Sequence, residues 1–353
     1  MQNSLFDLEN RYGSLSEAGD PAERLDAVID WEIFRPILEG IDAKAGKSAA
    51  GRRSACRILM FKLLVLQGMN GLSDERLQFQ VTDRLSFMRF LGLDLASDVP
   101  DARTVWAFGE ALKEHRLVDS LFERLKQALA DLGLQFKSGQ IIDATFVPVP
   151  IQRNSPEENA VIKAGALPAQ WEQDKNKLAQ KDTDARWTKK GGQSHYGYKD
   201  QVNIDKDTKL ITAHACTDAS VHDSQVLQTV LHPEDEDGKE LWADSAYRSE
   251  GEQARLKKSK HESQIHERAY RGKPLSEDQK VGHKAKSSVR ARVQHVFGHM
   301  QNSMGGMMLR TIGAQRARVG VALMNLTYKL KRIEVLIRLK VFGFARVSAP
   351  KVA

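Results

Sequence analysis

The sequence predicts an α/β chain in two parts: an all-α part over residues 1–136 and a mixed-sheet part over 137–346. Two observations support this division. The first part repeats short apolar segments at helical spacing, separated by tight turns. At Gln140 the period changes, because the run Gln-Ile-Ile-Asp-Ala-Thr-Phe-Val-Pro-Val is rich in β-branched and aromatic residues and ends at a proline.

In the first part, the densest apolar segment is 57–68, which is too apolar for a surface helix and is expected at the centre of a helical core. Ser73 is placed to cap a helix over 74–81, and Asp101 to cap a further helix after Pro100. Short helices joined by tight turns fit a helix-turn-helix-like DNA-binding module. They fit a plain helical bundle equally well.

The second part alternates strands and helices. After a strand from residue 140, a polar segment at about 150–193 is expected to be a partly helical insertion. The later elements are expected in this order: a hairpin over 196–204 and 209–217, a helix over 224–231, a strand over 241–244, a helix over 251–259, a strand over 263–266, a basic loop, and helices over 287–304 and 314–339. This order is that of a ribonuclease-H-like α/β fold, in whose mixed sheet the first and fourth strands are neighbours.

The charge of the chain is positive and uneven. The 353 residues carry a net charge of +7, and residues 251–300 alone hold 12 Lys and Arg against 5 Asp and Glu. Such a stripe commonly contacts phosphate backbones, although a solvated basic face has the same composition. The longest apolar stretch, 58–69, contains Lys62 and is shorter than the ~18 residues that a membrane span needs. The N-terminus resembles no targeting segment, so we expect a cytoplasmic protein without a membrane partner.

Two carboxylates are placed to do chemistry together. Asp143 lies inside an apolar strand and Asp244 ends one. A charge in a core strand is costly unless it is paired or binds a metal. Either residue alone could be a cap or a buried ion pair, but two of them on neighbouring strands favour a metal site. Phosphoryl transfer in DNA uses two divalent cations about 3.5–4 Å apart, held by hard oxygen ligands.

Short motifs from both parts of the chain stand in a recognisable order: residues 34–36, 72–75, 83–93, 100–104, 142–145, 197–199, 242–248, 289–293 and 324–326. In these motifs the chain resembles, nearly end to end, bacterial transposases of the insertion sequence 5 family, within the DDE group. The resemblance implies an enzyme that binds the terminal inverted repeats of its element, cuts the ends and transfers them to target DNA. It also implies two divalent cations, magnesium or manganese, and double-stranded DNA as partner. A homodimer or higher homo-oligomer is expected, because two ends must be joined in one complex.

The chain departs from the family pattern at one position. The family has Arg, three residues, then the catalytic Glu on the long helix; here Arg290 is followed by Gln294. A glutamine amide offers one uncharged oxygen and binds a divalent cation more weakly than a carboxylate. We therefore expect the catalytic positions to be Asp143, Asp244 and Gln294, with the metal at the two aspartates and cleavage impaired. The rival interpretation is a non-catalytic DNA-binding protein or repressor; a housekeeping nuclease of the same fold is a third.

Other acids and histidines are expected to have structural roles. Glu267 and Glu334 are expected to be solvated or salt-bridged, and Asp223 to be a helix N-cap. Neither His222 nor His295 is expected to be a metal ligand.

Several basic and aromatic residues are candidates for DNA contacts. Arg290 either contacts the phosphate of the cut strand or pairs with an aspartate. By position, the DNA backbone is expected to meet Tyr247, Arg248 and Lys199. Three arginines form a basic cluster at the start of the central helix: Arg52, Arg53 and Arg57. This cluster either contacts phosphates or is ordinary surface charge. Two tryptophans of the insertion either stack on an unpaired base or anchor the insertion: Trp171 and Trp187.

Overall fold

The computed structural model describes residues 7–44, 56–134, 139–231, 239–267, 269 and 274–348. The chain divides into two compact units, one of residues 1–135, 303–305 and 323–353 and one of residues 136–302 and 306–322. Within the described ranges, every helix is too short or too polar to cross a membrane. Arg52 and Arg53 lie outside the described residues.

The first unit is helical, as predicted. Its helices are α1 (Asp7–Glu17), α2 (Pro21–Val28), α3 (Arg35–Leu38), α4 (Arg57–Asn70), α5 (Asp74–Asp83), α6 (Leu85–Leu91), α7 (Ala102–Glu114) and α8 (Leu117–Asp131). The predicted central helix is α4, most of whose side chains are buried. Both predicted caps are confirmed, because Ser73 accepts from the backbone N–H of Arg76 at 3.2 Å and Asp101 from that of Thr104 at 2.6 Å.

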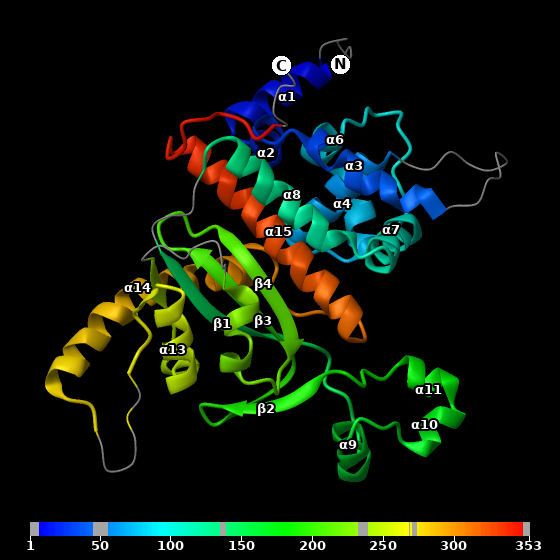
Figure 1. Ribbon diagram of the computed structural model, residues 1–353. Coiled ribbons are helices and arrows are strands. Elements are labelled where there is room, and N and C mark those ends of the chain that lie inside the picture. The colour runs from blue at the N-terminus through cyan, green and yellow to red at the C-terminus, as the bar shows by residue number, and fades with distance from the viewer. Residues whose placement is uncertain are drawn as a thin grey trace. The chain divides into compact units, whose positions relative to one another are not determined.

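The second unit is built on one mixed sheet (Figure 1). Its strands are β1 (Gln140–Pro148), β2 (Arg186–Lys190), β3 (Gln193–Asp205), β4 (Ile211–Asp218), β5 (Glu240–Trp242) and β6 (Glu262–Ser263). The order is β2-β3-β1-β5-β6, with β4 also paired to β3. β1 is antiparallel to β3 and parallel to β5, with Ile141 opposite Trp242. The predicted neighbourhood of the first and fourth expected strands is therefore confirmed.

The insertion after β1 contains α9 (Pro156–Lys163), α10 (Ala169–Gln173) and α11 (Lys175–Ala179), as its composition predicted. Its last part is β2, which extends the sheet and was not predicted. β2 pairs with the first residues of β3 through a hairpin whose turn is Gly191 and Gly192, both at positive φ.

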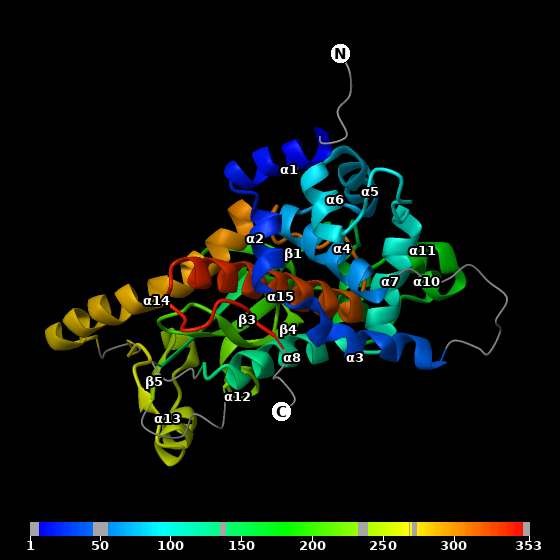
Figure 2. The same ribbon diagram turned by 90° about the horizontal axis from the view of Figure 1, so that it is seen from above.

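The remaining helices of the sheet unit correct two predictions. The predicted helix over 224–231 is broken into a 3-10 turn (Asp223–Gln225) and α12 (Leu227–Val230), which meet at Val226, whose φ of −104° departs from the regular helical value. α13 (Glu250–Lys258) is as expected. The helix expected from residue 287 is α14 (Glu277–Ser303), ten residues longer at its start and continuous in Figure 2. Its earlier start follows from a reciprocal cap between Ser276 and Gln279.

Alternation along β1 separates an apolar face from a polar one. Ile142 packs in a core cluster with Leu227 of α12 and Leu256 of α13. Asp143, the next residue, points to the other face and contacts α14. The charged side chain is therefore kept out of the apolar cluster although its strand is central.

The last helix, α15 (Ala314–Arg338), is shared by the two units. Residues from 323 onward belong to the helical unit, where Glu334 pairs with Arg24 at 3.0 Å and Lys329 lies over the ring of Phe122. The sequence instead placed the chain up to residue 346 with the sheet part. The difference arises because an apolar stripe shows that a helix packs, without showing against which partner.

Candidate active site

Asp143 is held inside β1 with its carboxylate satisfied. The residue is 5% exposed, and its Oδ1 accepts the backbone N–H of Ala144 at 2.9 Å. Its Oδ2 accepts from two side chains of α14. A carboxylate this buried needs such donors, because burial otherwise disfavours its charged form.

Asp244 lies two residues beyond β5, the strand parallel to β1. It caps the 3-10 turn Ser245–Tyr247, accepting the backbone N–H of Ser245 at 2.6 Å. The parallel pairing brings this strand end beside Asp143. The capping geometry orients the Asp244 carboxylate while leaving it partly open to solvent.

Two residues of α14 join these carboxylates. One guanidinium nitrogen of Arg290, Nη2, lies 3.1 Å from Oδ2 of Asp143 and 3.8 Å from Oδ2 of Asp244. One helical turn later, Nε2 of Gln294 donates to the same Oδ2 of Asp143 at 3.0 Å. The structure therefore brings together the three sequence-predicted positions, and Arg290 forms the ion pairs that were one of its two predicted roles.

The donor set determines what this site could hold. Within the described part of the chain, three or more His, Cys, Asp or Glu side chains do not come together as a metal-binding group. Asp143 and Asp244 supply the hard carboxylate oxygens that magnesium and manganese prefer. Gln294 supplies only an amide, whose N–H₂ faces Asp143. The residues fit a divalent cation at the two aspartates, with a neutral group at the third position.

Removing Arg290 should show how strongly the two aspartates depend on a cation. We expect Arg290→Met to lower the free energy of unfolding by about 2 kcal/mol without metal, because Asp143 loses its buried ion pair. Millimolar manganese should restore more stability to this variant than to the parent chain, since a bound cation replaces the guanidinium charge. Urea denaturation with and without manganese measures both effects.

Arg292→Met is the matched control, because Arg292 on the same helix makes an exposed ion pair with Asp207. Such a pair contributes less than about 1 kcal/mol. Equal losses in the two variants would contradict a special role for Arg290.

Tyr247 and Lys199 do not face solvent, which corrects the prediction that they meet the DNA backbone. Tyr247 is fully buried and its hydroxyl donates to Oε1 of Gln201 at 3.2 Å. Burial, and then the negative charges of Asp223 and Asp143, raise the pKa of this phenol well above its usual value. Lys199 is buried in β3 and donates to Oδ1 of Asp223 at 2.7 Å. Position after a strand for Tyr247, and within one for Lys199, indicated the neighbourhood of each side chain but not its direction.

The remaining basic candidates are partly exposed. Arg248 donates to the backbone carbonyl of Ile265 at 3.1 Å and keeps part of its side chain in solvent. Arg57 begins α4 and is also partly exposed. Contacts of Arg248 and Arg57 with DNA remain predictions.

The acids and histidines that were expected to be structural have intramolecular partners. Glu267 pairs with His283 and Lys286, and Glu334 with Arg24 and Arg338. Asp223 is not the predicted N-cap; His222 takes that position, and Asp223 forms ion pairs with Lys199 and Lys190. His295 contacts Lys209 through Nδ1 at 2.8 Å.

The two tryptophans of the insertion differ. Trp171 is fully buried, its Nε1 donates to Glu158 at 2.7 Å, and it anchors the insertion. Trp187 on β2 is 45% exposed and leans on Tyr196. Anchoring is thus the role of the first, while base stacking stays a prediction for the second.

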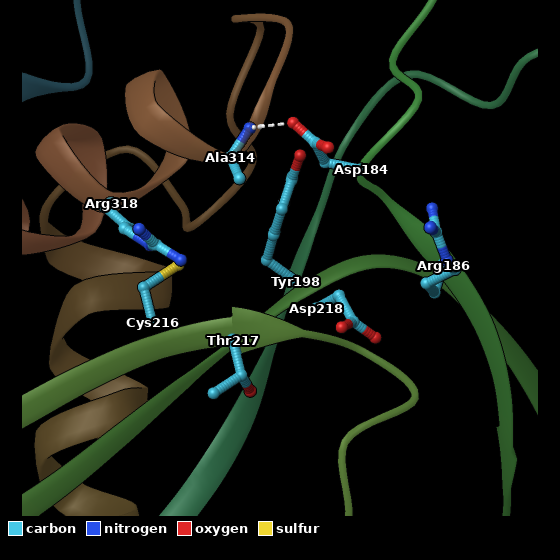
Figure 3. A pocket seen from close by; sticks show the side chains of 8 residues that line it. All are labelled: Asp184, Arg186, Tyr198, Cys216, Thr217, Asp218, Ala314 and Arg318. Atoms are coloured by element: carbon cyan, nitrogen blue, oxygen red, sulfur yellow. Dashed lines mark hydrogen bonds between the residues drawn. The ribbon is translucent and has the colours of Figure 1, made fainter. Parts of the chain in front are cut away.

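A cavity of about 190 Å³ lies elsewhere in the sheet unit, lined by Cys216, Thr217, Arg318 and neighbouring side chains (Figure 3). It contains none of the three predicted catalytic positions. Beside it, the carboxylate of Asp182 accepts from the Tyr198 hydroxyl and from the backbone N–H of Gly313, just before α15. Asp182 also accepts the backbone N–H groups of Asp184 and Ala185, so it joins a local turn to the distant Tyr198 and Gly313.

Comparison with known proteins identifies the family of the chain. The profile of the family described as the transposase DDE domain matches residues 134–330, more than half of the chain. A second profile, described as a transposase domain, matches residues 10–111. Among solved structures, the chain is similar to a piggyBac transposase in a synaptic complex with hairpin DNA. The two chains are 12% identical with a TM-score of 0.45, over 94% of this chain and 77% of the other.

Proposed function

Since the chain belongs to the family of transposases with a DDE domain, we propose that it binds the terminal inverted repeats of a mobile element. In this proposal it cuts DNA phosphodiesters at the element ends and joins the freed 3′-hydroxyls to target DNA. The site would lie at Asp143 and Asp244, weakened at Gln294. The observation that carries the proposal is the convergence on one guanidinium: Nη2 of Arg290 contacts both aspartates, and Gln294 donates to one of them.

Magnesium or manganese bound at the two aspartates would lower the pKa of the attacking hydroxyl and neutralise charge on the phosphate oxygens. Asp143, fixed within a strand, and Asp244, fixed by its own cap, would be the two residues that hold that cation. Arg290 keeps the two carboxylates facing one space. Tyr247, whose raised pKa keeps it a neutral phenol, adds no charge beside them.

Gln294 limits what the site can do. Its side chain reaches Asp143 with an N–H group, so a cation at Asp143 would require the amide to turn and would gain only a neutral oxygen. We expect cleavage to be slow and DNA binding to be retained. Two copies of the chain would be needed to hold two element ends.

The test compares the parent chain with Asp143→Asn and with Asp207→Asn, an exposed aspartate of the same unit. The DNA probes are fragments taken from both sides of the gene. We expect all three proteins to shift these fragments equally in gel-retardation assays. Manganese binding, followed by electron paramagnetic resonance, should weaken at least about tenfold only in Asp143→Asn. Equal manganese binding by the three proteins would overturn the site.

The second candidate function is a DNA-binding repressor without chemistry, which the neutral amide at Gln294 specifically favours. It predicts binding to the flanking fragments with no cleavage even after a carboxylate is restored at position 294. Cleavage without preference for the inverted repeats would instead identify a nuclease of general specificity.

A further inference from the structure

His266 lies between the strand end that carries Asp244 and the helix that carries Gln294. It follows β6, where the backbone N–H of His266 donates to the carbonyl of Ala243 at 3.2 Å and so continues the β5–β6 ladder. The side chain is buried, with the residue 5% exposed. Its Nδ1 lies 3.1 Å from the same Ala243 carbonyl, and its Nε2 lies 3.1 Å from Oγ of Ser287 on α14.

The partners determine the direction of one of these two hydrogen bonds. A carbonyl oxygen only accepts, so Nδ1 must carry the hydrogen that it donates to Ala243. The Ser287 hydroxyl can donate to Nε2 or accept from it, so this bond can form with the ring in either protonation state. The ring is therefore used at both nitrogens and bridges two elements of the sheet unit.

Both ends of this bridge are adjacent to the candidate active site. Ala243 directly precedes Asp244. Ser287 precedes Arg290 by three residues and Gln294 by seven, so these three side chains lie along one face of α14. Fixing Ser287 against Ala243 therefore fixes the spacing between the Asp244 carboxylate and the third position.

A second contact between the same segments lies beside the first. Glu267 accepts from Nζ of Lys286 at 2.8 Å and contacts Nε2 of His283 at 2.9 Å. Burial alone would raise the pKa of Glu267, but the hydrogen bond from Lys286 and further donors lower this pKa to about 2. The His283 ring meets His266 edge-on, with centroids 4.8 Å apart. The later half of α14 is held differently, by buried Val293, Val296 and Phe297.

We propose that His266 is a positioning residue, which holds the first half of α14 at the distance from Asp244 that cation binding requires. The inference rests on the proposed function for its consequence, but the docking of α14 is measurable without it. The polar contacts of His266 and Glu267 would determine where Gln294 lies relative to Asp244. The apolar residues of the later half keep the helix attached.

Variants at this bridge are expected to fold. The Ala243 carbonyl keeps its backbone donor when the ring is replaced, so no buried acceptor loses its last partner. Ser287 is an exposed residue, so its hydroxyl can be solvated when the ring is replaced. His266→Phe preserves the ring volume without the nitrogens. His266→Gln restores a polar atom near the position of Nε2.

The experiment measures docking and cation binding separately, in the Gln294→Glu background. Amide hydrogen exchange over residues 283–291 should accelerate at least about tenfold in His266→Phe and Ser287→Ala, while residues 293–300 stay protected. The manganese dissociation constant should rise about tenfold in both variants and recover partly in His266→Gln. Ser288→Ala, an exposed neighbour of Ser287, is the matched control and should change neither quantity.

Parent-like exchange and manganese affinity in His266→Phe and Ser287→Ala would overturn the positioning role. Accelerated exchange with unchanged manganese affinity would also overturn it, because His266 would then be merely structural. If Gln294→Glu with His266 intact binds no manganese, the proposed function fails. The exchange of residues 283–291 then still decides whether His266 docks α14.

Discussion

Gln294→Glu is expected to raise the rate of magnesium-dependent cleavage of the element ends about 100-fold, equivalent to about 2.7 kcal/mol of transition-state stabilisation. The reason is local. The amide that now donates to Oδ2 of Asp143 is replaced by a carboxylate of the same shape, which adds a charged oxygen ligand between α14 and β1. Cleavage of labelled end fragments under single-turnover conditions measures the rate.

The same change should destabilise the chain when no divalent cation is present. The new carboxylate at position 294 and that of Asp143 would then face each other as like charges, with Arg290 shared between them. Gln301→Glu is the matched control, because it makes the same change on an exposed position of α14. If Gln294→Glu binds end fragments and manganese but cuts no faster than Gln301→Glu, the catalytic role of position 294 is wrong.

Much of the fold could be predicted because its signals are local. The β-branched run at β1 and the caps at Ser73 and Asp101 act within a few residues, and the structure confirms them. The start of α14 was missed because the basic composition before residue 287 suggested a loop. The reciprocal cap between Ser276 and Gln279 nevertheless starts the helix there. The extra strand β2 was missed because its partner, β3, determines it more than its own polar sequence does.

The candidate site could be predicted where spacing determines geometry. Asp143 and Asp244 meet because their strands are parallel neighbours, and Arg290 and Gln294 share a face because they are four residues apart. Tyr247 could not be predicted in the same way. It belongs to the core cluster with Ile142 and Leu227, and its hydroxyl bonds to Gln201 of β3. These partners are far away in sequence, and no local pattern records such a pairing.

One buried charge could have been found from the sequence. Lys329 lies three residues after Leu326 and four before Ile333, both of which belong to the predicted apolar stripe of the last helix. The structure buries Lys329 completely, with its ammonium 4.1 Å from the centre of the Phe122 ring. Its Nζ makes no hydrogen bond to any residue that the structure describes. A lysine within an apolar stripe thus signals a buried ionisable group in the core of the helical unit.

Lys329→Met is expected to increase the free energy of unfolding by about 2–4 kcal/mol at pH 7, because the variant no longer buries an amine that lacks a hydrogen-bond partner among the described residues. The contact with Phe122 offsets part of the cost in the parent chain. Burial lowers the pKa of Lys329 to about 7, with Glu123 opposing and Lys126 adding to the shift. In the unfolded chain the pKa returns to about 10.4.

These two pKa values determine how stability changes with pH. Between pH 7 and about 10.4 the unfolded chain binds the proton more tightly than the folded chain, so raising the pH stabilises the parent by up to about 1.4 kcal/mol per pH unit. Lys329→Met lacks this contribution, so its advantage over the parent should shrink from pH 7.5 to pH 9.5. Urea denaturation at both pH values tests this, with Lys340→Met as an exposed control beyond the same helix. An advantage that is equal at the two pH values would mean that folding does not lower the pKa of Lys329. The buried amine would then keep its proton, and neighbouring groups would stabilise the charged ammonium.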